Sequence, residues 1–284
     1  MDEKIISNSD YNGMLFHEKD FRNIHFENSS FSDGSFEKTN MENSHVDRSS
    51  FDNMDFKNTN FGGSLMGGVY FDNCNFADSD FKNVFLEGSN IEDSKFSECC
   101  LKETVFSKCE FTKTDFSGCD LSGSKFANCS FNGCDLSKAD LSNCVFENCT
   151  FNGTVMESSK LKDGKFLGCN IKESSLRYSD LDNCSFAGSF ISHTDLDGTI
   201  FDNYRDSLGI TMSTKDFSDE MMSDMVNHVS SSRQKKSPAE TKKDIPIKDR
   251  LNLGTGNQKS PKAIIKGNIS SNSRTMGLLT KQFR

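Results

Sequence analysis

A single apolar residue returns at every fifth position over most of the chain. The series runs from Phe16 to Phe201 through 38 consecutive repeats, with Phe, Leu, Ile, Met or Val at each centre. A period of five fits neither the 3.6-residue turn of an α-helix nor the alternation of a β-strand. We therefore expect a backbone that turns a corner once per repeat and directs every central residue into a common interior.

The positions around each centre support this interpretation. Two residues before the centre the side chain is usually small, and ten of the 11 cysteines stand there, Cys100 being the exception. Two residues after the centre, 22 of the 38 repeats carry Asn or Gly, which tolerate the positive φ that a tight turn demands. The predicted interior contains large and small members of the pattern: Phe76, Phe96, Phe116, Leu136, Cys109, Cys129 and Cys149.

The repeat resembles a known sequence family. Segments such as Cys119-Asp120-Leu121-Ser122-Gly123 match the pentapeptide-repeat consensus of a small residue, Asp or Asn, Leu or Phe, and two polar residues. The resemblance covers about residues 14–203. It implies an all-β solenoid, a right-handed quadrilateral β-helix with four repeats per coil and about nine to ten coils.

Two short segments flank this predicted rod. Residues 1–13 form an N-terminal segment. Residues 204–232 predict a helix that caps the last coil or forms a dimer, because Ser213 and Asp216 make a capping box. An apolar face at helical spacing follows. Its residues are Phe217, Met221, Met222, Met225 and Val226, and Leu208, Ile210 and Met212 are expected to join them.

The last segment, residues 233–284, differs from the rod in charge. It holds 13 Lys and Arg against 3 Asp and Glu, a net charge of +10, whereas residues 16–203 hold 17 against 31, a net charge of −14. All three prolines of the chain lie in this segment. We predict a disordered basic tail that contacts nucleic acid, an acidic membrane surface or the rod, or that is simply solvated.

Neither a cofactor nor a metal is expected. The chain has no Cys-x2-Cys pair and only five His, which argues against structural zinc. Cysteines spaced by 20, such as Cys109 and Cys129, are interpreted as buried small hydrophobes. The mean hydropathy is −0.60, and no apolar run reaches the ~20 residues that span a bilayer. Because no signal peptide is recognised, we expect a cytoplasmic, reducing location.

The sequence does not predict an enzyme. Flat polar walls offer no concave pocket, which catalysis ordinarily requires. The stretch from Gly118 to Lys125 departs from the residue order of a phosphate-binding loop. Asp115 and Asp135 would lie near each other and could form an acid–base pair, but a solvated face is the favoured interpretation.

Two columns of outward-facing residues are candidate partner surfaces. They emerge when the sequence is folded by 20, which stacks the residues that precede the centres. Carboxylates in the acidic column either bind a partner or serve the turn, since Asp is also the family consensus there. The apolar stripe is either a partner or dimer contact or ordinary packing between coils. The acidic candidates are Asp80, Asp120, Asp140 and Asp180, with Asp115 and Asp135 on another wall, and the apolar candidates are Leu65, Phe85 and Val105.

The resemblance implies two kinds of non-enzymatic function. One branch of the family, associated with quinolone resistance and immunity, has rods that imitate duplex DNA and bind DNA gyrase, a topoisomerase, and the acidity of this rod favours that function. The alternative is a bacterial effector secreted into a host cell without a cleaved signal peptide, or an intracellular scaffold. In that case the rod docks a protein partner and the tail carries targeting. A homodimer is compatible with both.

Overall fold

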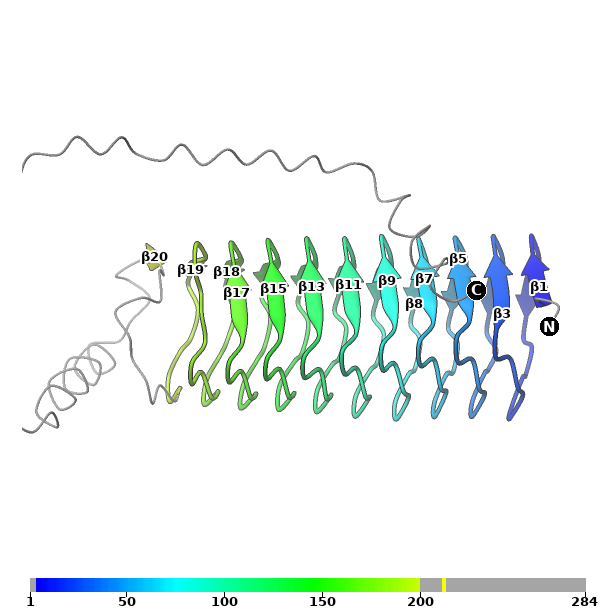
Figure 1. The fold of residues 1–284 in the computed structure, drawn as a ribbon, viewed down its shortest axis with the longest axis horizontal. Coiled ribbons are helices and arrows are strands. Elements are labelled where there is room, and N and C mark those ends of the chain that lie inside the picture. The colour runs from blue at the N-terminus through cyan, green and yellow to red at the C-terminus, as the bar shows by residue number, and fades with distance from the viewer. Residues whose placement is uncertain (1–3, 200–210, 213–284) are drawn as a thin grey trace, which may run out of the picture. The chain divides into compact units, whose positions relative to one another are not determined.

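The computed structural model describes residues 4–199 and 211–212. These residues form twenty β-strands and no helix, in a solenoid of stacked coils (Figure 1). Two of its walls are parallel sheets of nine and eleven strands. Wall 1 consists of β1 (Lys4–Ser7), β3 (Ile24–Glu27), β5 (His45–Asp47), β7 (Leu65–Gly67), β9 (Phe85–Glu87), β11 (Val105–Ser107), β13 (Lys125–Ala127), β15 (Val145–Glu147) and β17 (Lys165–Leu167). Wall 2 consists of β2 (Asp10–Asn12), β4 (Ser30–Ser32), β6 (Ser50–Asp52), β8 (Tyr70–Asp72), β10 (Asn90–Glu92), β12 (Glu110–Thr112), β14 (Ser130–Asn132), β16 (Thr150–Asn152), β18 (Asn170–Lys172), β19 (Phe190–Ser192) and β20 (Thr211–Met212).

Each coil contains 20 residues. Strands pair in parallel with the strand one coil further on, so that Leu65 lies beside Phe85 and Phe85 beside Val105. Walls 3 and 4 are held by single bridges, such as Ser35 to Asp55 on wall 3 and Asn40 to Asn60 on wall 4. Four walls in 20 residues require one five-residue repeat per wall, which confirms the predicted four-sided β-helix.

The interior is a set of stacked side chains, one column per wall. On wall 3 the ring of Phe76 lies between those of Phe56 and Phe96, with centroid distances of 4.9 and 4.5 Å. Stacked ring pairs contribute about 0.5–1.5 kcal/mol each beyond the area that they bury, which explains why Phe predominates at the centres. The interior residues predicted from the sequence are all at most 3 % exposed: Phe76, Phe96, Phe116, Leu136, Cys109, Cys129 and Cys149.

Where the residue two positions before the centre is Ser, Thr or Cys, it usually also acts as a hydrogen-bond donor. Its side chain commonly reaches the backbone carbonyl of a central residue in the preceding coil. The Ser64 hydroxyl donates to Met41 at 2.8 Å, the Thr104 hydroxyl to Phe81 at 2.8 Å, and the Cys119 thiol lies 2.7 Å from the Phe96 carbonyl. Ser, Thr and Cys therefore share this position because they are small and can satisfy a buried carbonyl.

Every corner from Asn8 to Gly198 has a positive φ two residues after the centre. Asn53 has φ of 53° and Gly63 of 70°, as the turn prediction required. Charged residues also occupy this conformation, for example Lys108 at 55°. The backbone amide of Lys108 donates to the carbonyl of Ala127 at 2.9 Å, so hydrogen bonding to the next coil holds the corner in place.

The solenoid begins earlier than the predicted start at residue 14. Strand β1 pairs with β3 and β2 pairs with β4, which places the first coil at residues 4–23. The reason is that Ile6 and Tyr11 continue the five-residue register before Phe16 and pack against the core.

Near the other end, the chain returns to wall 2 after residues 200–210. Met212, which was expected to join a helix, instead lies in β20, where it pairs in parallel with Ile191. Strand β20 thus pairs with the free edge of β19 and extends the sheet of wall 2 by one strand. The predicted helical residues Phe217, Met221, Met222, Met225 and Val226, and the predicted basic tail, lie outside the described residues.

Candidate protein-binding surfaces

The predicted acidic column lies on wall 4, and its members stack in successive coils. Asp120 bridges to Asp140, and Cys100 and Lys160 occupy the positions on either side. Asp80 and Asp180 lie further along the same column. Asp115 and Asp135 form an equivalent bridge on wall 3. The structure therefore brings these carboxylates into two columns on adjacent walls.

Each of these carboxylates also serves its own turn. One oxygen, Oδ1, accepts a hydrogen bond from the backbone amide two residues further on, at 2.8 Å for Asp135 and 3.1 Å for Asp140. Asn60 makes the same bond at 2.9 Å, which shows that the negative charge is not needed for it. Among the predicted candidates, Asp80, Asp115, Asp120 and Asp180 accept the same bond.

Lysines neutralise part of wall 4. The Lys102 ammonium lies 2.8 Å from the Asp120 carboxylate, and the Lys160 ammonium 3.4 Å from that of Asp140. Partial burial acts to raise the pKa of Asp120, but hydrogen bonds from Lys102 and from Ser122 outweigh it and hold that pKa below its ordinary value. Much of the charge on this wall is thus already satisfied within the protein.

The predicted apolar stripe lies on wall 1. Leu65, Phe85 and Val105 stack in successive strands and face outward, and all three are half-buried. The stripe ends at His45 on one side and at Lys125 on the other. Alongside it, the Lys108 ammonium lies 3.2 Å from the Glu87 carboxylate. Wall 1 therefore carries a narrow apolar stripe with a charge pair beside it.

A third surface, on wall 2, was missed by the sequence analysis. Asp52, Asp72 and Glu92 stack in successive strands, each directly after its centre. Within residues 4–199 no salt bridge involves any of the three. Folding the sequence by 20 at the position after the centre, instead of before it, would have revealed this column.

Tyr70 lies beside this acidic column, in the stack of residues that precede the centres, between Ser50 and Asn90, and is 38 % exposed. Partial burial, followed by the nearby carboxylates of Asp72 and Glu92, raises the pKa of Tyr70. Wall 2 therefore presents an aromatic ring next to a row of carboxylates.

The acidity is also uneven along the coils. Residues 4–23 hold three acidic and three basic residues, and residues 24–123 hold 18 acidic and 8 basic residues. Residues 124–199 hold 10 acidic and 7 basic residues. Most of the negative charge is therefore in the five coils from the second to the sixth.

Family models match most of this solenoid. The model described as "Pentapeptide repeat region" matches residues 4–81 and 121–196, and that described as "Pentapeptide repeats (8 copies)" matches residues 89–128. The chain belongs to the pentapeptide-repeat family. A search of curated proteins gave no significant match.

Solved structures of other pentapeptide-repeat proteins are similar to this one at low identity. QnrB1, a plasmid-mediated fluoroquinolone resistance protein, is 17 % identical over 70 % of this chain and 95 % of its own, with a TM-score of 0.49. HetL from the cyanobacterium Nostoc, involved in heterocyst differentiation regulation, is 14 % identical over 70 % and 87 %, with a TM-score of 0.43. At these scores the likenesses carry no argument about function.

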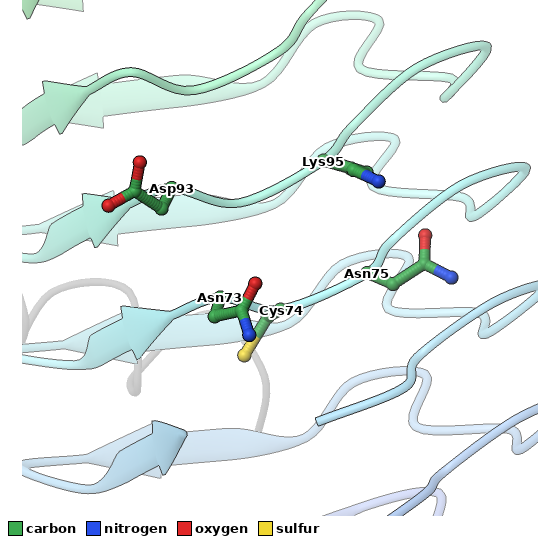
Figure 2. A pocket seen from close by; sticks show the side chains of 5 residues that line it. All are labelled: Asn73, Cys74, Asn75, Asp93 and Lys95. Carbon is green, nitrogen blue, oxygen red and sulfur yellow. The ribbon is translucent and has the colours of Figure 1, made fainter. Parts of the chain in front are cut away.

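A shallow polar recess lies on the walls of this pentapeptide-repeat protein. It has a volume of about 150 Å³ and lies where wall 2 turns into wall 3. Figure 2 shows Asp93 and Lys95 on one coil and Asn73, Cys74 and Asn75 on the neighbouring coil. The side-chain amide of Asn73 donates a hydrogen bond to Oδ1 of Asn53 at 3.1 Å. The lining residues are Asn73, Cys74, Asn75, Asp93 and Lys95.

The cysteine thiols are mostly buried. All eleven are free, and ten of them are buried, whereas Cys100 is half-buried. Burial raises the pKa of Cys74, Cys134, Cys144 and Cys184 to about 12, so these thiols are not nucleophiles at neutral pH.

Two further absences concern the described part of the chain. Among residues 4–199 there is no group of three His, Cys, Asp or Glu side chains that could hold a metal ion. The same part of the chain contains no helix long and apolar enough to cross a membrane.

Proposed function

We propose that this protein is a non-enzymatic rod that binds a positively charged surface on a macromolecule, and that wall 2 is the binding face. The observation that carries the proposal is the column Asp52, Asp72 and Glu92. Its carboxylates are stacked one coil apart and form no salt bridge within residues 4–199. Carboxylates that no salt bridge neutralises keep their charge available to a partner, and a row of one sign steers association with the opposite charge.

The specific partner proposed is the DNA-binding surface of DNA gyrase. Five coils at ~4.8 Å each span about 24 Å. Duplex DNA of that length carries about 14 phosphate charges, and residues 24–123 carry a net charge of −10. The rod thus approaches the axial charge of DNA in this segment, whereas the segment from 124 to 199, with a net charge of −3, does not.

A gyrase supercoiling assay with the full chain tests the proposal. The wild-type protein is expected to inhibit supercoiling or to protect the enzyme from a quinolone. A wall 2 variant carrying Asp52→Asn, Asp72→Asn and Glu92→Gln should be weaker by about tenfold, because steering by the acidic row is lost.

The matched control removes three charges from wall 4 through Asp80→Asn, Asp120→Asn and Asp140→Asn. Asn keeps the turn hydrogen bond, so folding is preserved and the total charge equals that of the wall 2 variant. A smaller effect than that of the wall 2 variant supports wall 2 as the binding face. Equal effects of both variants would contradict the assignment to wall 2, and no effect of the wild-type protein would exclude gyrase as the partner.

A further inference from the structure

Among the described residues, nothing pairs with the outer hydrogen-bonding edge of the first coil, residues 4–23. In later coils the residue before each centre donates its backbone amide to the preceding coil, as Ser35 does to Met14 and Asn40 to Lys19, both at 2.9 Å. The equivalent amides of Leu15 and Asp20 have no such acceptor among residues 4–199. Strand β1 likewise pairs with β3 alone. An open parallel edge of this kind is a template for another strand.

The same coil exposes more apolar surface than any other described coil. Three of the six exposed large hydrophobic residues belong to it: Ile5 at 57 %, Met14 at 42 % and Leu15 at 64 %. The Phe16 ring stacks on that of Phe36 at 4.8 Å but has no ring on its other side among the described residues. Further along the same wall, the ring of Phe76 is stacked on both sides, on Phe56 and Phe96, so the end ring lacks one partner by comparison.

Charge does not oppose contact at this end. Three acidic and three basic residues give the first coil no net charge. Arg22 and Asp20 pair at 2.6 Å, and the guanidinium holds the pKa of Asp20 at about 2. The next coil, residues 24–43, holds four acidic residues against one basic residue. The end coil is therefore a neutral surface on an acidic rod.

We propose that two copies of this chain associate end to end through their first coils. A two-fold axis perpendicular to the coil stack sets the strands of the two end coils antiparallel, which allows the unpaired backbone groups to bond across the contact. A second copy offers the same four-sided cross-section, another set of end rings to stack on, and no net charge. This contact differs from a dimer formed through Phe217 and its neighbours.

The mass of the full chain in solution tests the proposal. At about 100 μM, where a dimer with a micromolar dissociation constant is nearly complete, light scattering should give twice the chain mass of 31.7 kDa. The double variant Ile5→Asp with Leu15→Asp should weaken the dimer by about tenfold or more, because each carboxylate would lose water at the contact without gaining a partner.

The matched control is the double variant Tyr178→Asp with Phe190→Asp. These residues are 57 % and 46 % exposed but lie in later coils, and the control should leave the dimer intact. Circular dichroism establishes that both variants are folded. A monomeric wild-type protein, or a dimer that the first-coil variant leaves unchanged, would overturn the proposal.

Hydrogen exchange at high and low protein concentration locates the contact independently of any variant. Amides of residues 4–23 should become more protected as the dimer forms. Protection that instead appears in residues 213–232 would assign the dimer to the C-terminal segment and refute the end-to-end contact.

Discussion

Walls 2 and 4 both carry columns of carboxylates, but the carboxylates have different surroundings. On wall 4 they precede the centres, and those of Asp120 and Asp140 accept backbone amides and face lysines. On wall 2 those of Asp52 and Asp72 follow the centres, and within the described coils they form no salt bridge. The position of an acidic residue within the repeat thus decides its role. Before the centre its carboxylate supports the turn, and after the centre on wall 2 its carboxylate is free of salt bridges in the described coils and can face a partner.

The geometry of the turn explains the difference. An oxygen of the residue before the centre reaches the amide of the residue after it, as in the 2.8 Å bond from Ser137 to Asp135. A residue after the centre has no equivalent amide within reach, because the chain has already entered the corner of positive φ.

Removal of an interior ring should destabilise the whole solenoid, and with it both walls. Phe76→Ala would leave a cavity between the rings of Phe56 and Phe96 and should lower the free energy of unfolding by about 3–5 kcal/mol, as measured by urea denaturation. Phe76→Leu, which keeps an apolar side chain, should cost much less. A loss below about 1 kcal/mol for the alanine variant would mean that the stack contributes little.

Removal of a turn carboxylate should separate the position before the centre from the position after it. Asp135→Ala, before a centre of wall 3, loses the hydrogen bond from the Ser137 amide and should cost about 1 kcal/mol of unfolding free energy. Asp135→Asn keeps the acceptor and should cost almost nothing, as should Asp72→Ala, after a centre of wall 2. If Asp72→Ala proved as destabilising as Asp135→Ala, the distinction between the two positions would fail.

The stability supplied by Asp120 should depend on pH. Because its pKa is lowered in the folded state, its stabilising effect is present above the ordinary value of about 3.9 and is lost as the pH falls through the lower, folded-state pKa. The difference in unfolding free energy between wild type and Asp120→Asn should therefore vanish in acid. A Lys102→Gln background should flatten this dependence, and an unchanged pH profile in that background would argue against the lysine as its cause.

Cys100 should be the one reactive thiol of the described coils. It replaces an acid in the column of wall 4, whereas the other ten thiols are buried. Labelling of the native protein with a maleimide should modify one cysteine, and Cys100→Ser should abolish the labelling with almost no change in stability. Rapid labelling of several thiols would show that the coils open readily.

Part of the binding surface could be read from the sequence and part could not. Folding by 20 placed Asp120 beside Asp140 and Leu65 beside Phe85 correctly, because the register has no insertion from Phe16 to Phe201. It did not reveal which carboxylates are engaged with backbone amides or lysines, since such bonds depend on side-chain direction and on distances across the corner. For the same reason the column on wall 2 was not recognised.

The five-residue period was enough to predict the coil. One apolar residue in five and a positive φ at each corner leave the backbone a single way to bury its centres, so the four walls and the interior follow from periodicity. The tertiary structure alone decided where the repeat starts, that Met212 returns to wall 2, and which charges are already paired. These depend on contacts between coils, where a neighbour 20 residues away, or the absence of one at an end, determines what a side chain can do.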